Sequence, residues 1–173
     1  LAQSSWTKCS MASLWTGFYP VRTGVTRFDH VTPSEAVMPA EIFREAGYRT
    51  AALYRNGWVS GYFGFDQGFD VYDRPASRPP PRDVRMENPT IRGGGTDSDV
   101  TEAAIEFLRI NGKDRWFLYL HLMDIHEYTY TEDTAIFGSS YSDVYDNSIR
   151  HTDSELGSFF VHLAEKGYLE NTL

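Results

Sequence analysis

The sequence predicts an α/β protein in which a mainly parallel sheet is flanked by helices. Short apolar runs, such as "TAALY" at residues 50–54 and "RWFLYLHLM" at residues 115–123, alternate with stretches of helical periodicity. Glycine or proline stands at the ends of several of these stretches, where the chain must turn. Near-continuous apolar runs are typical of strands that are covered by helices on both faces of a parallel sheet.

The composition indicates a folded domain and argues against a nucleic-acid partner. The 173 residues are enough for one domain with a sizeable core, and 41% of them are hydrophobic. The net charge is −8, and no Lys/Arg-rich tract is present. No apolar run approaches the length of a membrane span, and a single Cys excludes an internal disulfide. We expect residues 1–173 to be one part of a single domain that is truncated at both ends, because the chain reaches a motif within six residues and stops directly after a long helical pattern.

The first half of the chain contains two predicted helices and one predicted strand. A helix over residues 10–15 ends at Gly17, and a second helix over residues 39–46 ends at Gly47, because glycine is the usual residue just past a helix C-terminus. Residues 50–54 follow as a buried strand. Residues 55–98 are predicted to be mostly loop, since they carry many glycines and aromatics, a Pro run at 79–81 and a Gly run at 93–95.

The second half is predicted to hold two helices around the apolar strand at residues 115–123. Asp97 or Ser98 is the expected cap of the first helix. The second helix is expected over residues 142–166. The apolar positions expected to face inward are Val100, Ala104, Phe107 and Leu108 in the first helix, and Ile149, Leu156, Phe160 and Leu163 in the second.

Chemistry is expected first in the opening segment "SSWTKCSMASLWTGFYP", residues 4–20. A hydroxyl placed at a helix N-terminus meets unpaired backbone N–H groups and the positive end of the helix dipole, which together favour a tetrahedral oxyanion. Thr7 and Ser10 are the candidate hydroxyls, and Lys8 is a candidate cation for the substrate. The alternative is that Thr7 or Ser10 simply caps the helix.

The second place is "HLMDIHEY", residues 121–128, where His121, Asp124 and His126 follow the apolar strand within six residues. In an open α/β sheet, binding sites lie beyond the carboxyl ends of the strands. Such a cluster can ligate a metal, move protons or hold an anion. The alternative is a loop whose His and Asp side chains hydrogen-bond the backbone.

At these segments the chain resembles the sulfatase family of the alkaline-phosphatase-like superfamily. The family signature is a Cys or Ser, then x-Pro-Ser-Arg-x-Ser-Leu-x-Thr-Gly-x-x-Pro. The stretch "TKCSMASLWTGFYP" matches it at six positions: Ser10, Ser13, Leu14, Thr16, Gly17 and Pro20. Further matches are "EIFREAGYRTAALY", "FGFDQGFDVYD", "FLYLHLMDIHEY" and the segment from "YDNSIRHTDSEL" to the end. The resemblance implies a partial sulfatase-like domain.

This register places Thr7 at the nucleophile position, while Cys9 takes the position of the signature Pro. Cys9 is not expected to become formylglycine, because Met11 and Ser13 stand where that modification needs Pro or Ala and then Arg. No formylglycine is therefore expected, and a buried, unreactive state is expected for Cys9. A Thr activated by a metal is the nucleophile of phosphodiesterase and phosphotransferase relatives, so Thr7 favours phosphoester over sulfate-ester chemistry.

The resemblance also implies roles for the other candidate residues. His126 corresponds to the His of the family's Asp-Pro-His segment, which contacts the bound sulfate or phosphate, and Asp124 corresponds to that segment's Asp. His121 stands where some relatives also carry His. Two positions depart from the family: Met11 replaces an Arg, and "YRNGW" replaces a Gly-Lys-Trp-His stretch, with Arg55 or Asn56 as candidate substitutes.

A divalent metal ion (Ca, Zn, Mn or Mg) is the implied cofactor, with Thr7 as one ligand. In the family the carboxylate ligands come from an N-terminal Asp-Asp pair and a later Asp-His or Asp-Asn pair, which would lie outside residues 1–173. We therefore expect this segment alone to be inactive. The implied substrate is a small-molecule, lipid or glycan ester of sulfate or phosphate. The sequence leaves the compartment and the oligomeric state open.

Two functions remain after this reading. The first is a metal-dependent ester hydrolase or transferase with Thr7 as nucleophile. The second is a non-catalytic relative that keeps the fold as a binding or scaffold domain, which loss of the signature's Cys, Pro and Arg would fit. A hydroxyl at Thr7 and an imidazole at His126 favour the enzyme.

Overall fold

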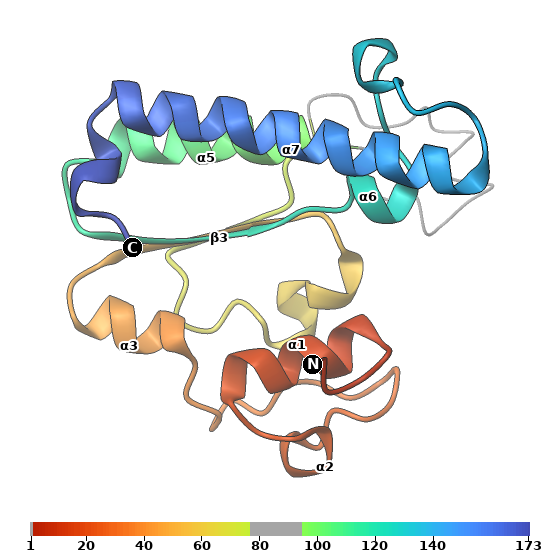
Figure 1. Ribbon diagram of the computed structural model, residues 1–173. Coiled ribbons are helices and arrows are strands. Elements are labelled where there is room, and N and C mark those ends of the chain that lie inside the picture. Colours follow the sequence, from red (N-terminus) through yellow and green to blue (C-terminus); the bar gives the residue numbers. More distant parts are fainter. Residues whose placement is uncertain (1, 77–94) are drawn as a thin grey trace.

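A computed structural model describes residues 2–76 and 95–173 and has three layers, with a parallel sheet between two groups of helices (Figure 1). The strand order is β2-β1-β3, so β1 (Arg49–Tyr54) lies between β2 (Val71–Asp73) and β3 (Trp116–His121). Both pairings are parallel, and Tyr54 is opposite His121 where β1 and β3 end. The predicted fold class is confirmed.

Helices of the first and second halves of the chain cover opposite faces of this sheet. Figure 1 shows α5 and α7 side by side on one face, and α1, α2 and α3 on the other. The helices are α1 (Thr7–Thr16), α2 (Pro20–Thr23), α3 (Pro39–Glu45), α5 (Asp97–Asn111), α6 (Asp124–Glu127) and α7 (Tyr141–Glu165). Short 3-10 turns are η1 (Gly57–Val59), η2 (Gly61–Phe63), η4 (Glu132–Thr134) and η5 (Tyr168–Asn171).

The alternation of side chains along β1 divides the hydrophobic core into two clusters. Ala51 and Leu53 pack with α5 and α7, whereas Ala52 and Tyr54 pack with α1 and the loops beside it. Successive residues of a strand point to opposite faces, so a central strand must be apolar at nearly every position. The first cluster also contains Val100, Ala104, Phe107, Leu108, Phe159 and Leu163, and the second contains Ala12, Trp15, Val25, Met38, Ala40, Val59, Phe65 and Phe69.

The helix ends agree with the sequence prediction in part. Gly17 ends α1 with a φ of 70°, and Gly47 follows α3 with a φ of 81°, both in the left-handed region that glycine adopts without a Cβ penalty. The cap of α5 was predicted one or two residues too late. Thr96 is the cap, and it exchanges hydrogen bonds with Asp99 in a capping box.

The loop-rich stretch at residues 55–98 contains a strand that the prediction missed. β2 is only three residues long, and its pairing with β1 joins residues 20 positions apart, so no local pattern identifies it. Asp70 helps to place it, because its backbone N–H donates to Thr50 and its carboxylate accepts from the Thr50 N–H. The predicted loop features at 79–81 and 93–94 lie outside the described residues.

The inward face of α7 differs from the prediction. Leu163 is buried as expected, but Ile149 is 40% exposed and Phe160 is 53% exposed. The middle of the buried face is polar instead and consists of Asn147, Ser148, His151 and Thr152. Periodicity of apolar residues cannot reveal such a face, because here the helix packs against a buried polar cluster.

Strand β3 is half-buried at every position rather than buried on both faces, and it forms one edge of the described sheet. Among the residues that the structure describes, no helix has both the length and the apolar character needed to cross a membrane.

Candidate functional site

A cavity of about 720 Å³ lies where the carboxyl ends of β1 and β3 meet the N-terminus of α1. Thr7, Asn56, His121 and His126 all line it, although they are up to 119 positions apart in the sequence. Parallel strands deliver the residues that follow them to one edge of the sheet, which explains the convergence. The cavity thus combines Thr7 with both predicted histidines.

Thr7 is the first residue of α1 and is half-buried at the cavity. The cap residue of α1 is Trp6, whose side chain makes no capping hydrogen bond. The alternative reading, in which Thr7 or Ser10 caps the helix, is therefore wrong. The Thr7 hydroxyl instead lies 3.5 Å from the side-chain nitrogen of Asn56.

Asn56 follows β1 directly and presents a donor to Thr7. Its Oδ1 accepts a hydrogen bond of 2.9 Å from the backbone N–H of Trp58. Because a backbone N–H can only donate, this bond fixes the amide so that the Nδ2 group points toward the Thr7 oxygen. Of the two candidate substitutes in "YRNGW", Asn56 reaches the cavity and Arg55 does not.

The two histidines come from opposite ends of the β3–α6 connection. His121 is the last residue of β3, and its Nδ1 lies 2.7 Å from the hydroxyl of Tyr119. Burial lowers the pKa of His121 from its usual value, and Asp97 opposes this shift only in part, so the ring is neutral at neutral pH. His126 lies in α6 and is exposed at the cavity.

A comparison of the sequence with models of protein families identifies the family of the chain. The sequence matches the Sulfatase family over residues 2–173, which is nearly the whole chain. The chain belongs to the sulfatase family. A comparison with curated proteins found no match.

Solved structures of the same superfamily share the fold. The lipoteichoic acid synthase LtaP from Listeria monocytogenes is 18% identical with a TM-score of 0.64, over 97% of this chain and 42% of that one. Ps i-CgsB, solved with k-i-k-neocarrahexaose, is 17% identical with a TM-score of 0.73, over 99% and 47%. An alkaline phosphatase superfamily protein from Vibrio parahaemolyticus is 20% identical with a TM-score of 0.64, over 94% and 40%. This sulfatase-family chain thus spans less than half the length of these three proteins.

Lys8, predicted to contact substrate, does not line the cavity of this sulfatase-family chain. Its side chain is fully buried, and its ammonium donates to the carbonyls of Phe28 at 2.5 Å and His30 at 2.7 Å. Three aromatic rings surround it, the nearest being Phe63 with its centroid 3.9 Å away. Desolvation lowers the pKa of Lys8, and Asp29 opposes the shift. Lys8 therefore anchors α1 to the loop at residues 28–30.

Asp124, also predicted to contact substrate, is fully buried behind the cavity wall. One carboxylate oxygen pairs with Arg55, and the other accepts a 2.9 Å hydrogen bond from the backbone N–H of Asp97. Desolvation raises the pKa of Asp124, while these two donors act in the opposite direction. Asp124 therefore anchors the start of α6 to Arg55 and α5.

Of the signature residues that depart from the family, Cys9 lies in the core and Met11 lies at the cavity. Cys9 is 5% exposed, so its predicted burial is confirmed. Met11, at the position of the family's Arg, lines the cavity and contributes no charge there.

Tyr128 and Tyr145 also line the cavity, and neither was predicted from the sequence. Tyr128 could have been noticed from its place two residues after His126, whereas no local signal marks Tyr145 on α7.

The described residues fit only part of a metal site. Thr7 offers a hydroxyl and the two histidines offer imidazoles, but none of the described residues that line the cavity carries a carboxylate. The buried carboxylates Asp97 and Asp124 are paired with Arg55. Within residues 2–76 and 95–173 no group of three or more His, Cys, Asp or Glu residues could hold a metal ion.

Proposed function

We propose that this chain carries the nucleophile of an ester hydrolase or transferase of the sulfatase family, with Thr7 as the nucleophile and phosphoesters as the favoured substrates. The observation that supports this most is the contact between the Thr7 hydroxyl and the Asn56 amide inside a cavity that His121 and His126 also line. A Thr cannot be converted to formylglycine, so the oxygen of Thr7 itself must attack.

In the proposed first step, Oγ1 of Thr7 forms a bond to phosphorus, and the bond from phosphorus to the ester oxygen breaks. The Thr7 proton passes to the neutral imidazole of His121 and then to the departing alcohol oxygen, so that one proton moves from nucleophile to leaving group. The Asn56 amide and His126 hold oxygens of the transferred group. Water, or an acceptor alcohol in a transferase, then takes the phosphoryl group and restores the Thr7 hydroxyl.

A divalent metal ion belongs to this proposal, with Thr7 as one of its ligands. When bound, such an ion lowers the pKa of the hydroxyl and offsets the charge on the phosphoryl oxygens. The carboxylates that would complete its coordination are not among the described residues that line the cavity. We therefore expect activity from the whole protein and not from residues 1–173 alone.

The substrate class stays broad. One solved neighbour is a lipoteichoic acid synthase and another was solved with a neocarrahexaose, so lipid-linked and glycan esters are both candidates beside small molecules. The cavity is open and is lined partly by Tyr128 and Tyr145, whose rings can pack against the non-reacting part of any of these.

The test is a side-by-side assay of the whole protein on an aryl sulfate, an aryl phosphate and an aryl phosphodiester, with and without a chelator. We expect the phosphodiester to be the best substrate, the chelator to remove turnover, and Thr7→Ala to reduce turnover by about 10³-fold or more, as loss of a nucleophile does. Cys9→Ala serves as the control and should retain activity. Full activity in Thr7→Ala, or loss in Cys9→Ala alone, would contradict the assignment.

The rival function, a non-catalytic sulfatase-like binding domain, predicts no turnover of any of the three esters. It also predicts that Thr7→Ala leaves ligand binding unchanged.

A further inference from the structure

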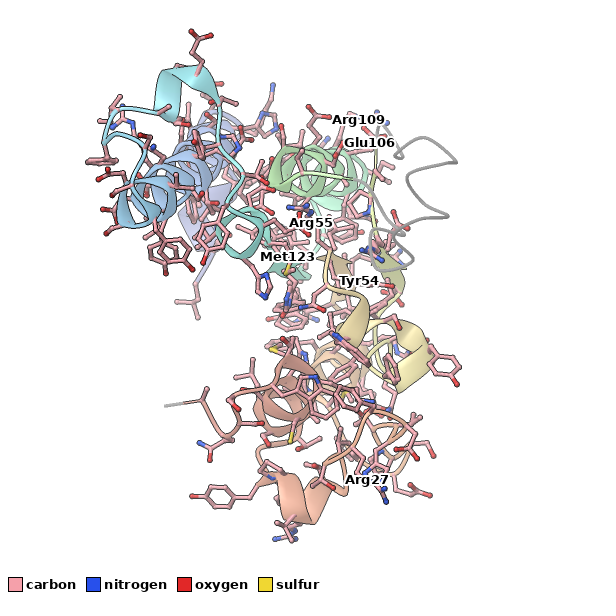
Figure 2. All side chains as sticks on the ribbon, turned by 90° about the vertical axis from the view of Figure 1, so that its right-hand side faces the viewer. Arg27, Tyr54, Arg55, Glu106, Arg109 and Met123 are labelled. Atoms are coloured by element: carbon pink, nitrogen blue, oxygen red, sulfur yellow. The ribbon has the colours of Figure 1, made fainter. Side chains whose placement is uncertain are left out.

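Arg55 joins three elements, β1, α5 and α6, and α6 is the helix that carries His126. It follows β1 directly, is 7% exposed, and ends in a guanidinium group with two separately engaged nitrogens. One nitrogen pairs with Asp97 at 3.0 Å and with Asp124, and the other pairs with Glu127 at 2.6 Å. In Figure 2, Arg55 lies in the middle of the molecule beside Met123, where β3 leads into α6.

The two contacts to α6 are made at its two ends. The helix runs from Asp124 to Glu127, and these are the two residues that Arg55 holds. His126 lies between them and faces the cavity. A helix of four residues cannot hold itself together in water, because too few of its backbone groups are paired. The position of His126 therefore depends on contacts from outside the helix.

Asp97, at the start of α5, also holds the start of α6. Its carboxylate accepts hydrogen bonds from the backbone N–H groups of Met123 at 2.7 Å and Asp124 at 3.1 Å, and from Thr152 of α7 at 3.2 Å. His151 also lies 3.5 Å from Asp124. Arg55 is the cation that lets these two carboxylates stay buried together, since a buried carboxylate without a partner is strongly unfavourable.

We propose that Arg55 is a positioning residue for the proposed reaction: its guanidinium clamps both ends of α6 and so holds His126 at the cavity that contains Thr7. This inference rests on the proposed function for its catalytic consequence, whereas the clamp itself can be measured without any activity. Arginine suits the role because its planar fork reaches two partners at a fixed separation, which a lysine ammonium cannot do.

The most selective variant removes only the ion pair between Arg55 and Glu127 and keeps the pair between Arg55 and Asp124. The Glu127 side chain is 49% exposed, so Glu127→Ala takes away one ion pair without leaving a cavity or an unpaired buried charge. The chain offers a matched control in the Glu106–Arg109 pair on α5. That pair has a distance of 2.5 Å and a Glu side chain that is 57% exposed, and Figure 2 shows it away from Arg55. Glu106→Ala therefore tests loss of a surface Glu–Arg pair in general.

The experiment uses the whole protein and two readouts. Amide hydrogen exchange reports on residues 124–127, and steady-state kinetics with an aryl phosphodiester report kcat and KM. We expect Glu127→Ala to speed exchange in α6 and to lower kcat about tenfold with little change in KM, because small misplacements of a catalytic group cost one to two orders of magnitude in rate. Glu106→Ala should change neither readout. Glu127→Gln, which keeps an acceptor oxygen for Arg55, should fall between wild type and Glu127→Ala.

Two results would overturn the inference. Unchanged exchange in Glu127→Ala would mean that Arg55 does not clamp both ends of α6. Faster exchange with an unchanged kcat would mean that the clamp exists but does not position a group that the reaction uses. If the wild-type protein turns over no ester, the proposed function fails instead, and the exchange measurement still decides whether Arg55 holds α6.

Discussion

The cavity has an α1 wall, which includes Thr7, Ser10 and Met11, and an α6 wall, which includes His121 and His126. A buried cation holds each wall in place, and the two cations are of different kinds. On the α1 wall, Lys8 donates to the carbonyls of Phe28 and His30 inside an aromatic shell. On the α6 wall, Arg55 pairs with three carboxylates. Neither cation lines the cavity, so both act on the site through the elements that they anchor.

The difference lies in what each cation would leave behind if it were removed. Around Lys8 the partners are neutral carbonyls and rings, which tolerate the loss of a charge. Around Arg55 the partners include Asp97 and Asp124, both fully buried, which do not. A buried cation among carbonyls therefore contributes much less to stability than one that neutralises buried carboxylates.

The largest expected effect tests this difference directly. Arg55→Met should lower the free energy of unfolding by about 3–5 kcal/mol, because it removes the arginine that neutralises two buried carboxylates. Lys8→Met should cost only about 1–2 kcal/mol, since a side chain of similar length fills the same space and leaves two carbonyls without donors. Urea unfolding of the two variants and the wild type measures both values. Equal losses of unfolding free energy in the two variants would contradict the difference between the two cations.

The next prediction concerns Asn56, which follows β1 and faces Thr7 of the α1 wall. Asn56→Ala removes the donor that lies 3.5 Å from the Thr7 hydroxyl. We expect turnover of an aryl phosphodiester to fall about tenfold, less than for a short oxyanion contact because this one is long. Asn56→Asp, which keeps the acceptor for Trp58 but removes the donor, should lose as much. An unchanged rate in both variants would remove Asn56 from the site.

On each wall, the sequence predicted residues that line the cavity and missed the contacts that hold the wall in place. The segments with Thr7, His121 and His126 could be found because a signature register and a strand-end cluster are local patterns. The buried state of Lys8 could not be foreseen, since its partners come from residues 28, 30, 58 and 63. For the same reason Asp124 was expected in the substrate site, although Arg55 holds it 69 positions away in sequence. Partners this distant meet only in the folded chain.

The smallest effect concerns the charge of His121 on the α6 wall. Burial lowers its pKa in the folded state below the usual 6.5, so the unfolded chain binds this proton more readily. Stability should therefore fall as the pH drops from 6.5 through the lowered pKa, and His121→Gln should reduce this loss. An NMR titration should place the His121 midpoint below 6.5. A midpoint at or above 6.5 would mean that the ring is more exposed to water or to negative charge than the structure indicates.

The central claim is that the oxygen of Thr7 attacks the substrate. The most direct measurement is mass spectrometry of the whole protein after acid quenching during turnover of an aryl phosphodiester. The account predicts a phosphoryl-containing adduct on the peptide that carries Thr7, assigned to Thr7 by fragmentation, and no adduct in Thr7→Ala. An adduct on Cys9, or the same adduct yield in Thr7→Ala, would contradict it.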